Sequence, residues 1–372
     1  MQEAIIGSDD EQVIVTLNRL GACLREAGRL EEAEGIWRRC LNIKETRFGP
    51  RDVQVTSTLC ELGRCARESG HLDEAGELLR RCLTVQEVEL GLEDVDVAYT
   101  LHELGSCARE AGRVDEAGEH YRRCLAIEEA KLGPDDAQVA ITLYALGSLL
   151  GDIGHMDEAE ELLRRCLAIE EADGGEDVDV AATLYHLGSC IRATGRLDEA
   201  EKLLRRSLTI QEANTDPEDT WTASTLYSLG VCVRDAGRLD EARGILLRCL
   251  AIEEVELRND DLTLALTLHE LGFCARKAGD FVEAAVLFRR CLGIVEVNLG
   301  RENSEMVETS RHQLGDKSDG QIEKSTLRAV QLERAKMLLF RHFMTEDVQQ
   351  DDRNVDADEV LRDLRECLLG LQ

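Results

Sequence analysis

The chain has 372 residues, 43% of them hydrophobic and 32% charged, and a formal net charge of −31. Such a charge disfavours bare nucleic acid and anionic membrane surfaces as partners. No apolar run reaches the roughly 18 residues that a membrane span needs, and the N-terminal MQEAIIGSDD lacks the basic start and apolar run of a secretory signal. We therefore expect a cytoplasmic protein that binds neither nucleic acid nor membranes.

The first nine residues read as a lead into a repeated region. The string IIGSDDEQV at 5–13 is similar to LGPDDAQV at 132–139, which separates two later units. Residues 1–9 are therefore predicted to be the end of a preceding unit, as in a piece of a longer array. Ser8 and Glu11 have the spacing of a capping box, which predicts that the first helix starts there.

Seven similar units follow. A leucine–glycine pair recurs in steps of 42, 42, 42, 41, 42 and 42 residues. A fixed period of this size predicts a solenoid, in which each unit buries its apolar face against its neighbours. The units are predicted at 10–51, 52–93, 94–135, 136–176, 177–218, 219–260 and 261–302. The recurring glycines, called LG glycines below, are Gly21, Gly63, Gly105, Gly147, Gly188, Gly230 and Gly272.

Each unit is predicted to form two helices. In the first helix of the third unit, Val97, Leu101, Leu104 and Ala108 make one apolar stripe at the helical period. The LG glycine lies on its flank, where the missing side chain lets the second helix approach. Another glycine seven residues later, Gly112 in this unit, supplies the left-handed turn that ends the first helix.

Twelve of the fourteen cysteines follow the same period. Leu149 and Ser207 each replace one of them, which suits a small packed side chain better than an obligatory disulfide. We therefore expect core cysteines in a reducing compartment, and no spacing here predicts a metal site. The columns are Cys23, Cys65, Cys107, Cys190, Cys232 and Cys274, two residues after the LG glycine, and Cys40, Cys82, Cys124, Cys166, Cys249 and Cys291, nineteen after it.

The pattern decays after residue 302. Residues 303–372 are predicted to hold a degenerate eighth unit, with Gly315 as its LG glycine, and then helices at 325–343 and 356–371. A solenoid needs a terminal cap with a polar outer face, and these helices suit that role. The predicted fold is all-α: an α-solenoid of seven helix–turn–helix units with a helical C-terminal cap.

These columns resemble the tetratricopeptide repeat (TPR). Leu104, Gly105, Gly112, Ala117 and Tyr121 match its leucine–glycine, turn glycine, alanine and aromatic positions. The 42-residue period and the loop LGPDDAQV are similar to the kinesin light chain type, although no heptad coiled coil is present. The resemblance implies a right-handed superhelix whose first helices line a concave groove for extended peptides.

Three positions of each first helix share a face away from the apolar stripe: three before, one after and four after the LG glycine. Guanidinium groups suit carboxylates and phosphates, and tyrosine and histidine rings add flat surfaces. We therefore predict that this groove binds an acidic, extended peptide segment with an aromatic anchor. The predicted binding residues are Arg25, Arg67, Arg109, Arg192, Arg234 and Arg276, called the arginine column below, and Asn18, His102, Tyr144, Tyr185, Tyr227 and His269.

A second interpretation has equal weight. Acidic residues follow several of these arginines, as Glu26 and Glu68 do, and they or the acids of the next unit could neutralise the column as ordinary surface pairs. The paired arginines of the second helices, such as Arg122 and Arg123, are expected to form a solvated outer face rather than an anion site.

The function that these patterns favour is a non-catalytic protein-interaction scaffold. The alternative is a sensor or regulatory module of a larger signalling protein, such as a nucleotide-binding immune-type receptor. No Gly-rich phosphate loop, HExxH or GxSxG motif occurs, and Cys107 is one of six equivalent cysteines rather than a singular nucleophile. We therefore expect no enzyme activity and no cofactor.

Overall fold

The computed structural model describes residues 2–172, 174, 176–214, 219–258, 261–294, 297 and 298, with side chains from residue 11 onward. All regular structure in this part of the chain is helical. The chain divides into two compact units, one of residues 1–258 with 267–287 and one of residues 259–266 with 288–372. The predicted degenerate eighth unit around Gly315 and the predicted helices at 325–343 and 356–371 lie outside the described residues.

The helices alternate between first and second members of a pair. The first helices are α1 (Gln2–Glu26), α3 (Thr56–Glu68), α5 (Val95–Glu110), α7 (Ala137–Asp152), α9 (Val178–Ala193), α11 (Thr220–Asp235) and α13 (Leu262–Lys277). The second helices are α2 (Leu30–Phe48), α4 (Leu72–Glu89), α6 (Val114–Lys131), α8 (Met156–Ala172), α10 (Leu197–Asn214) and α12 (Leu239–Glu256), with a 3-10 turn, η1 (Val53–Val55), before α3. Residues 281–294 are also helical.

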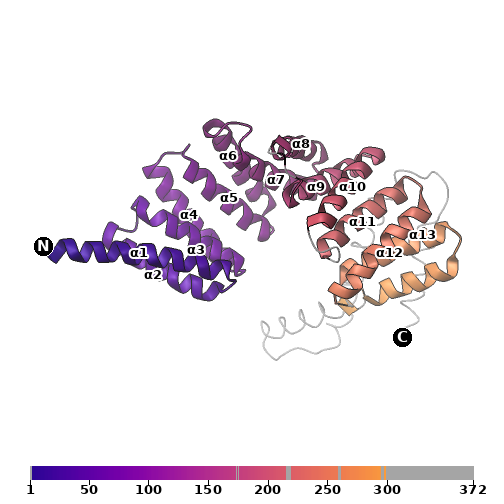
Figure 1. Ribbon diagram of the computed structural model, residues 1–372, viewed down its shortest axis with the longest axis horizontal. Helices are drawn as coiled ribbons and strands as arrows, with labels where there is room; N and C mark the ends of the chain where they lie inside the picture. Colours follow the sequence, from indigo (N-terminus) through magenta and orange to yellow (C-terminus); the bar gives the residue numbers. More distant parts are fainter. Residues whose placement is uncertain are drawn as a thin grey trace, which may run out of the picture. The chain divides into compact units, whose positions relative to one another are not determined.

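Consecutive helices pack against each other from α1 through α12 (Figure 1). First helices of neighbouring pairs also touch, α3 with α5, α5 with α7, α7 with α9 and α9 with α11. These contacts confirm the predicted all-α solenoid of helix pairs, and they place the first helices side by side as one surface.

The glycines carry out the two roles predicted for them. Gly112 has φ +72°, and bonds from Arg113 N–H to Ala108 O (2.8 Å) and from Gly112 N–H to Arg109 O (3.0 Å) close the end of α5 as a Schellman motif. A β-carbon on Gly105 would lie 2.6 Å from the Tyr121 ring, so only glycine lets α6 come this close. Close helix packing therefore offsets the roughly 1 kcal/mol that glycine costs inside a helix.

The cysteine columns are core residues, as predicted. Each described cysteine is a free thiol, and all but Cys23 and Cys291 are buried. Cys82 shows the usual setting: its sulfur lies 3.2 Å from Thr56 O and 3.7 Å from Thr100 Oγ1. The second-column cysteines thus sit where one helix pair meets the next.

The predicted start of the first helix is wrong. Helix α1 begins at Gln2, so Ser8 lies inside the helix instead of capping it. The similar string at 132–139 contains Pro134, whose missing N–H and fixed φ stop a helix, and residues 2–9 contain no proline. Without that break, the helical pattern of the first unit continues toward the N-terminus.

Candidate functional site: the face of the first helices

All twelve predicted binding residues lie on first helices and are half-buried. They belong to the surface formed by the positions three before, one after and four after each LG glycine. We call this surface the first-helix face. The structure therefore places all the predicted residues on first helices, and the partners of these residues decide what they can bind.

The arginine column is paired with acids of the following unit. Each acid of the first series stands five residues after the next LG glycine. The guanidinium group of one unit therefore reaches across the junction to the last turn of the next first helix. The pairs are Arg25–Glu68 (3.0 Å), Arg67–Glu110, Arg109–Asp152 (2.9 Å) and Arg192–Asp235 (3.2 Å).

A second series of acids, two residues before the LG glycine, completes the pairing where it is present. Glu103 Oε2 lies 3.5 Å from Arg67 Nη2, and its Oε1 lies 3.3 Å from Arg64 Nε. Glu270 pairs with Arg234, and only 2% of its surface is exposed. These carboxylates are buried, so each depends on its guanidinium partner for compensation.

The pKa values of these carboxyls follow from burial and charge. Burial raises the pKa of Glu103, and the neighbouring Arg67 and Arg64 oppose that rise only in part. Burial would also raise the pKa of Glu270, but hydrogen bonds from His269 and Arg234, with their charges, bring it below its ordinary value. The acids of the next unit thus neutralise much of the column, as the second interpretation of the sequence predicted.

The column is interrupted in the fourth unit. Gly151 stands where the other units have arginine, and a β-carbon there would lie 2.9 Å from Cys190 Sγ. Helices α7 and α9 therefore approach too closely for a side chain at this position. We call the position of Gly151 the gap in the column. Arg109, in the unit before the gap, donates a hydrogen bond to Ser148 Oγ (2.9 Å) and pairs with Asp152. Its side chain is 34% exposed, against 11–24% for Arg25, Arg67, Arg192 and Arg234.

Aromatic rings gather beside this gap. The His186 ring lies 5.5 Å from the Tyr144 ring and 5.1 Å from the Tyr185 ring, both edge to face. Burial lowers the pKa of His186 and raises that of Tyr144, so both rings are neutral near pH 7. His186 was not predicted as a site residue. The sequence feature that could have identified it is its position two residues before the LG glycine, where Glu61, Glu103 and Glu270 stand in other units.

The remaining predicted residues are spread along the face. The Asn18 side-chain oxygen Oδ1 accepts a hydrogen bond from Cys40 Sγ (3.1 Å), and the His102 ring lies 5.4 Å from the Tyr121 ring. At the other end, His269 Nδ1 lies 3.4 Å from Glu270, and Arg276 stacks over the Phe273 ring at 5.6 Å. Tyr227, on α11, is half-buried. Of the predicted set, the structure brings Arg109, Tyr144 and Tyr185 together around the gap.

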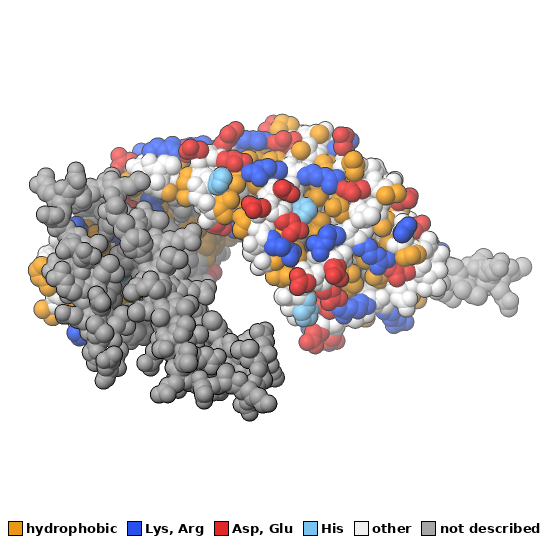
Figure 2. All heavy atoms as spheres, turned by 180° about the vertical axis from the view of Figure 1, so that it is seen from behind, with side chains coloured by type: hydrophobic (Ala, Val, Ile, Leu, Met, Phe, Trp, Pro, Cys, Tyr) orange, Lys and Arg blue, Asp and Glu red, His pale blue; other side chains and the backbone are white. Residues whose placement is uncertain are grey.

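The arginines of the second helices are also paired between units. Basic and acidic side chains are interspersed on the molecular face shown in Figure 2. The first arginine of a pair reaches a glutamate of the next unit, as in Arg122–Glu158 (3.1 Å), and the second reaches back, as in Arg123–Glu87 (2.7 Å). The outer face is therefore a mixed-charge surface rather than a cationic patch.

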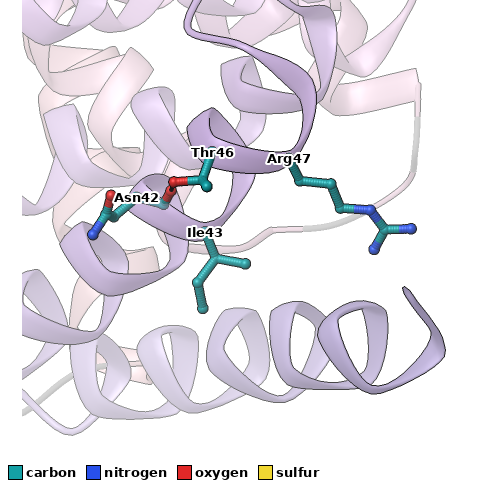
Figure 3. A pocket seen from close by; sticks show the side chains of 4 residues that line it. All are labelled: Asn42, Ile43, Thr46 and Arg47. Atoms are coloured by element: carbon teal, nitrogen blue, oxygen red, sulfur yellow. Dashed lines mark hydrogen bonds between the residues drawn. The ribbon is translucent and has the colours of Figure 1, made fainter. Parts of the chain in front are cut away.

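Two open depressions lie away from the first-helix face. One is lined by Asn42, Ile43, Thr46 and Arg47 of α2 (Figure 3). The other is lined by Glu87, Leu92, Glu93, Arg123, Ala126, Ile127 and Ala130. Within the described residues, no helix is long and apolar enough to cross a membrane, and no cluster of His, Cys, Asp and Glu is arranged to hold a metal ion.

Known proteins share this architecture. The model of the family described as tetratricopeptide repeat matches residues 12–87, 96–172, 179–254 and 229–296, more than half of the chain. No curated protein sequence matches. Among solved structures, BtubC (BKLC) from P. vanneervenii is 21% identical with a TM-score of 0.49, over 66% of this chain and 91% of that one.

Two further solved structures are similar. A putative kinesin light chain from Podosopora anserina with nearly identical TPR-like repeats is 21% identical, with a TM-score of 0.29, over 65% of this chain and 95% of that one. The apo form of RapI is 12% identical, with a TM-score of 0.58, over 76% of this chain and 97% of that one. The likeness to RapI concerns the fold alone. Together with the repeated glycine columns and the stacked helix pairs, the family match shows that this chain belongs to the tetratricopeptide repeat family.

Proposed function

We propose that this protein is a non-catalytic, cytoplasmic interaction scaffold that holds an extended acidic peptide segment on its first-helix face, anchored by an aromatic side chain beside Gly151. Protein–protein binding in general is what the tetratricopeptide fold supports. The observation that carries the finer proposal is the interruption of the arginine column, where Arg109, less buried than Arg25, Arg67, Arg192 and Arg234, meets a group of aromatic rings.

The buried thiols support a scaffold without catalysis in a reducing compartment. Burial raises the pKa of Cys107 and, to about 12, that of Cys124, so neither thiol is set up to ionise as a nucleophile. Free buried cysteines in every described unit fit a compartment that keeps thiols reduced.

The arginines differ in how readily they can exchange partners. Arg109 and Asp152 expose 34% and 55% of their side chains, and a pair this exposed contributes under about 1 kcal/mol. A peptide carboxylate can therefore replace Asp152 at little cost. Removing Arg234 from Glu270 would instead leave a carboxylate buried without its cation. Peptide recognition thus falls to Arg109 and, next to it along the column, to Arg192.

The aromatic group supplies the second part of the proposed site. Tyr144, Tyr185 and His186 are half-buried, so each offers part of a ring to a ligand. Ser189 Oγ, one residue after its LG glycine, is buried and has no hydrogen-bond partner among the described residues. An aromatic side chain could pack edge to face against these rings while a neighbouring carboxylate reaches a guanidinium group.

The test uses fluorescein-labelled peptides in which glutamates flank one tyrosine, compared with peptides that carry glutamine for glutamate or alanine for tyrosine. Fluorescence anisotropy of the full chain gives the affinities. We expect both peptide changes to weaken binding, and the double variant Arg109→Gln with Arg192→Gln to weaken it about tenfold, or about 1.4 kcal/mol.

The matched control is Arg122→Gln with Arg205→Gln. These outer-face arginines are 50% and 46% exposed and also pair with glutamates of the next unit. Both double variants lose the same charge, so a general electrostatic attraction would weaken equally in the two. Equal affinity of the two variants for the glutamate–tyrosine peptide would overturn the proposal.

A further inference from the structure

One cysteine of the seven units stands outside the two recurring columns. Cys60, on α3, occupies the position three before its LG glycine, and Cys82, on α4, follows that glycine by nineteen. Only the second unit has cysteine at both positions. The other units have Asn18, His102, Tyr144, Tyr185, Tyr227 and His269 at the first of them.

The side chains at these two positions touch each other. In the first unit, Cys40 Sγ donates to Asn18 Oδ1 at 3.1 Å. In the second unit, α3 packs against α4, Cys60 and Cys82 belong to one buried cluster, and the Cys60 thiol donates a hydrogen bond to Cys82 Sγ. Both thiols are free. Two free thiols in contact can be joined by a disulfide when an oxidant removes two electrons from them.

The contact makes the two thiols differ in acidity. Burial raises the pKa of Cys124 and Cys166, which stand at the position of Cys82 in other units, to about 12. The pKa of Cys82 is lowered instead, because hydrogen bonds from Cys60 and Thr100 stabilise its thiolate against the effect of burial. The hydrogen bond to Cys82, together with burial, raises the pKa of Cys60 well above its usual value. Cys82 therefore ionises more readily than Cys60, and the thiolate is the form that attacks an oxidant.

The surroundings of the pair limit what can reach it. Cys82 is 0% exposed and Cys60 is 4% exposed. Arg64, close enough to Cys60 for their charges to interact, is half-buried and donates to the hydroxyl of Tyr99 (2.6 Å), which is 37% exposed. Partly exposed polar side chains thus lie beside Cys60. We expect a molecule as small as hydrogen peroxide to pass between them where a bulkier oxidant does not.

We propose that Cys60 and Cys82 form a redox-sensing dithiol, which hydrogen peroxide converts into a disulfide that links α3 to α4. The Cys82 thiolate attacks one peroxide oxygen and the O–O bond breaks. The released hydroxide takes up the proton that Cys82 had lost and becomes water, and Cys82 is left as a sulfenic acid. The Cys60 thiol then attacks the Cys82 sulfur, the S–S bond forms, and the sulfenic oxygen leaves as water with the Cys60 proton. The two thiols lose two electrons and the peroxide gains two.

The experiment treats the reduced full chain with a small molar excess of hydrogen peroxide. The remaining thiols are then blocked with N-ethylmaleimide in denaturant, and tandem mass spectrometry of a protease digest identifies linked peptides. Fragmentation is needed because Cys82 and Cys107 share one tryptic peptide. We expect a Cys60–Cys82 link within one chain, which dithiothreitol separates. It should form about tenfold or more faster than Cys124 is oxidised, since that thiol stays protonated and has no second thiol at the position of Cys60.

Two variants use residues that the chain itself has at these positions. Cys60→Asn takes the residue type of Asn18, and Cys82→Ser that of Ser207, so both should fold, which urea midpoints check. Cys60→Asn should leave Cys82 as a sulfenic acid that dimedone traps, whereas Cys82→Ser should leave Cys60 unlabelled.

Three results would overturn the proposal. The first is the absence of the linked peptide in the unmodified chain. The second is oxidation of Cys124 as fast as that of Cys82. The third is a link that joins two chains instead of two helices of one chain. Dimedone labelling of Cys60 in Cys82→Ser, without labelling of Cys82 in Cys60→Asn, would overturn the assignment of Cys82 as the attacking thiol.

Discussion

The Thr100 hydroxyl on α5 donates a 2.7 Å hydrogen bond to the Gln86 side-chain oxygen on α4, and both side chains are buried. The bond joins one helix pair to the next. The same two positions meet as Thr183–Glu170 (3.2 Å), Gln211–Thr225 (2.9 Å) and Thr267–Glu253 (3.0 Å). Glutamine and glutamate therefore occupy equivalent places between the units, and glutamate brings a titratable group into the core.

Replacing Glu128 by glutamine should stabilise the protein near neutral pH. Burial raises the pKa of Glu128, and hydrogen bonds from Thr142 and Cys124 oppose the rise only in part. A carboxyl whose pKa is higher in the folded state binds its proton more tightly there, so its contribution to stability falls as pH rises. We expect Glu128→Gln to gain on the order of 1 kcal/mol near pH 7 and much less near pH 5, by urea unfolding.

The control for this prediction is a glutamate outside the core. Glu129, one residue later, forms an exposed pair with Arg165, and its replacement by glutamine should lose a few tenths of a kcal/mol or nothing. A gain for Glu128→Gln that stays constant between the two pH values would contradict the assignment of a raised carboxyl pKa.

Two glycines of the sixth unit should respond to alanine in opposite directions. A β-carbon on Gly230 would lie 2.7 Å from the Leu246 side chain, whereas one on Gly244 meets nothing within 4 Å. Gly230→Ala should destabilise the protein by about 1–3 kcal/mol through overpacking. Gly244→Ala, inside α12, should stabilise it by up to about 1 kcal/mol through helix propensity. Urea midpoints of the two single variants provide the test, and a gain for both would contradict the steric role of Gly230.

The two glycines that recur in every unit explain why the fold could be predicted from the sequence. Gly105 and Gly112 have fixed roles, close packing and a left-handed turn, and a role that recurs at a constant step can be recognised without coordinates. The start of α1 could not be predicted in the same way. The likeness of residues 5–13 to a loop was one of composition, and the proline that ends a helix in that loop is missing.

The first-helix face was predictable in position but not in its contacts. The spacing predicts that Arg67 and Arg234 share one face of the first helices, and the structure places them on two first helices, α3 and α11. Their partners Glu103 and Glu270 stand 36 residues later, on the first helix of the next unit, and one helix considered alone does not reveal such a pairing. His186 was missed for the same reason, because it replaces an acid of that second series.

The arginine column should separate into structural and exchangeable members. Arg234 is 11% exposed and pairs with Glu270, which is 2% exposed, so Arg234→Gln leaves a buried carboxylate without its cation. We expect this change to cost about 3–5 kcal/mol. Arg122→Gln, which breaks the exposed pair with Glu158, should cost under about 1 kcal/mol. Similar urea midpoints for the two variants would show that the Arg234 pair is no more important than a surface contact.

The gap in the column should depend on one contact between neighbouring first helices. The β-carbon of Gly151→Ala would meet Cys190 Sγ at 2.9 Å, so this variant should unfold at lower urea. Cys190→Ala removes the sulfur and should destabilise the protein on its own, because Cys190 is only 5% exposed. The double variant should recover part of the loss, with a coupling free energy on the order of 0.5–3 kcal/mol. Strict additivity of the two changes would mean that α7 and α9 can separate freely, and that Gly151 is not required for their close approach.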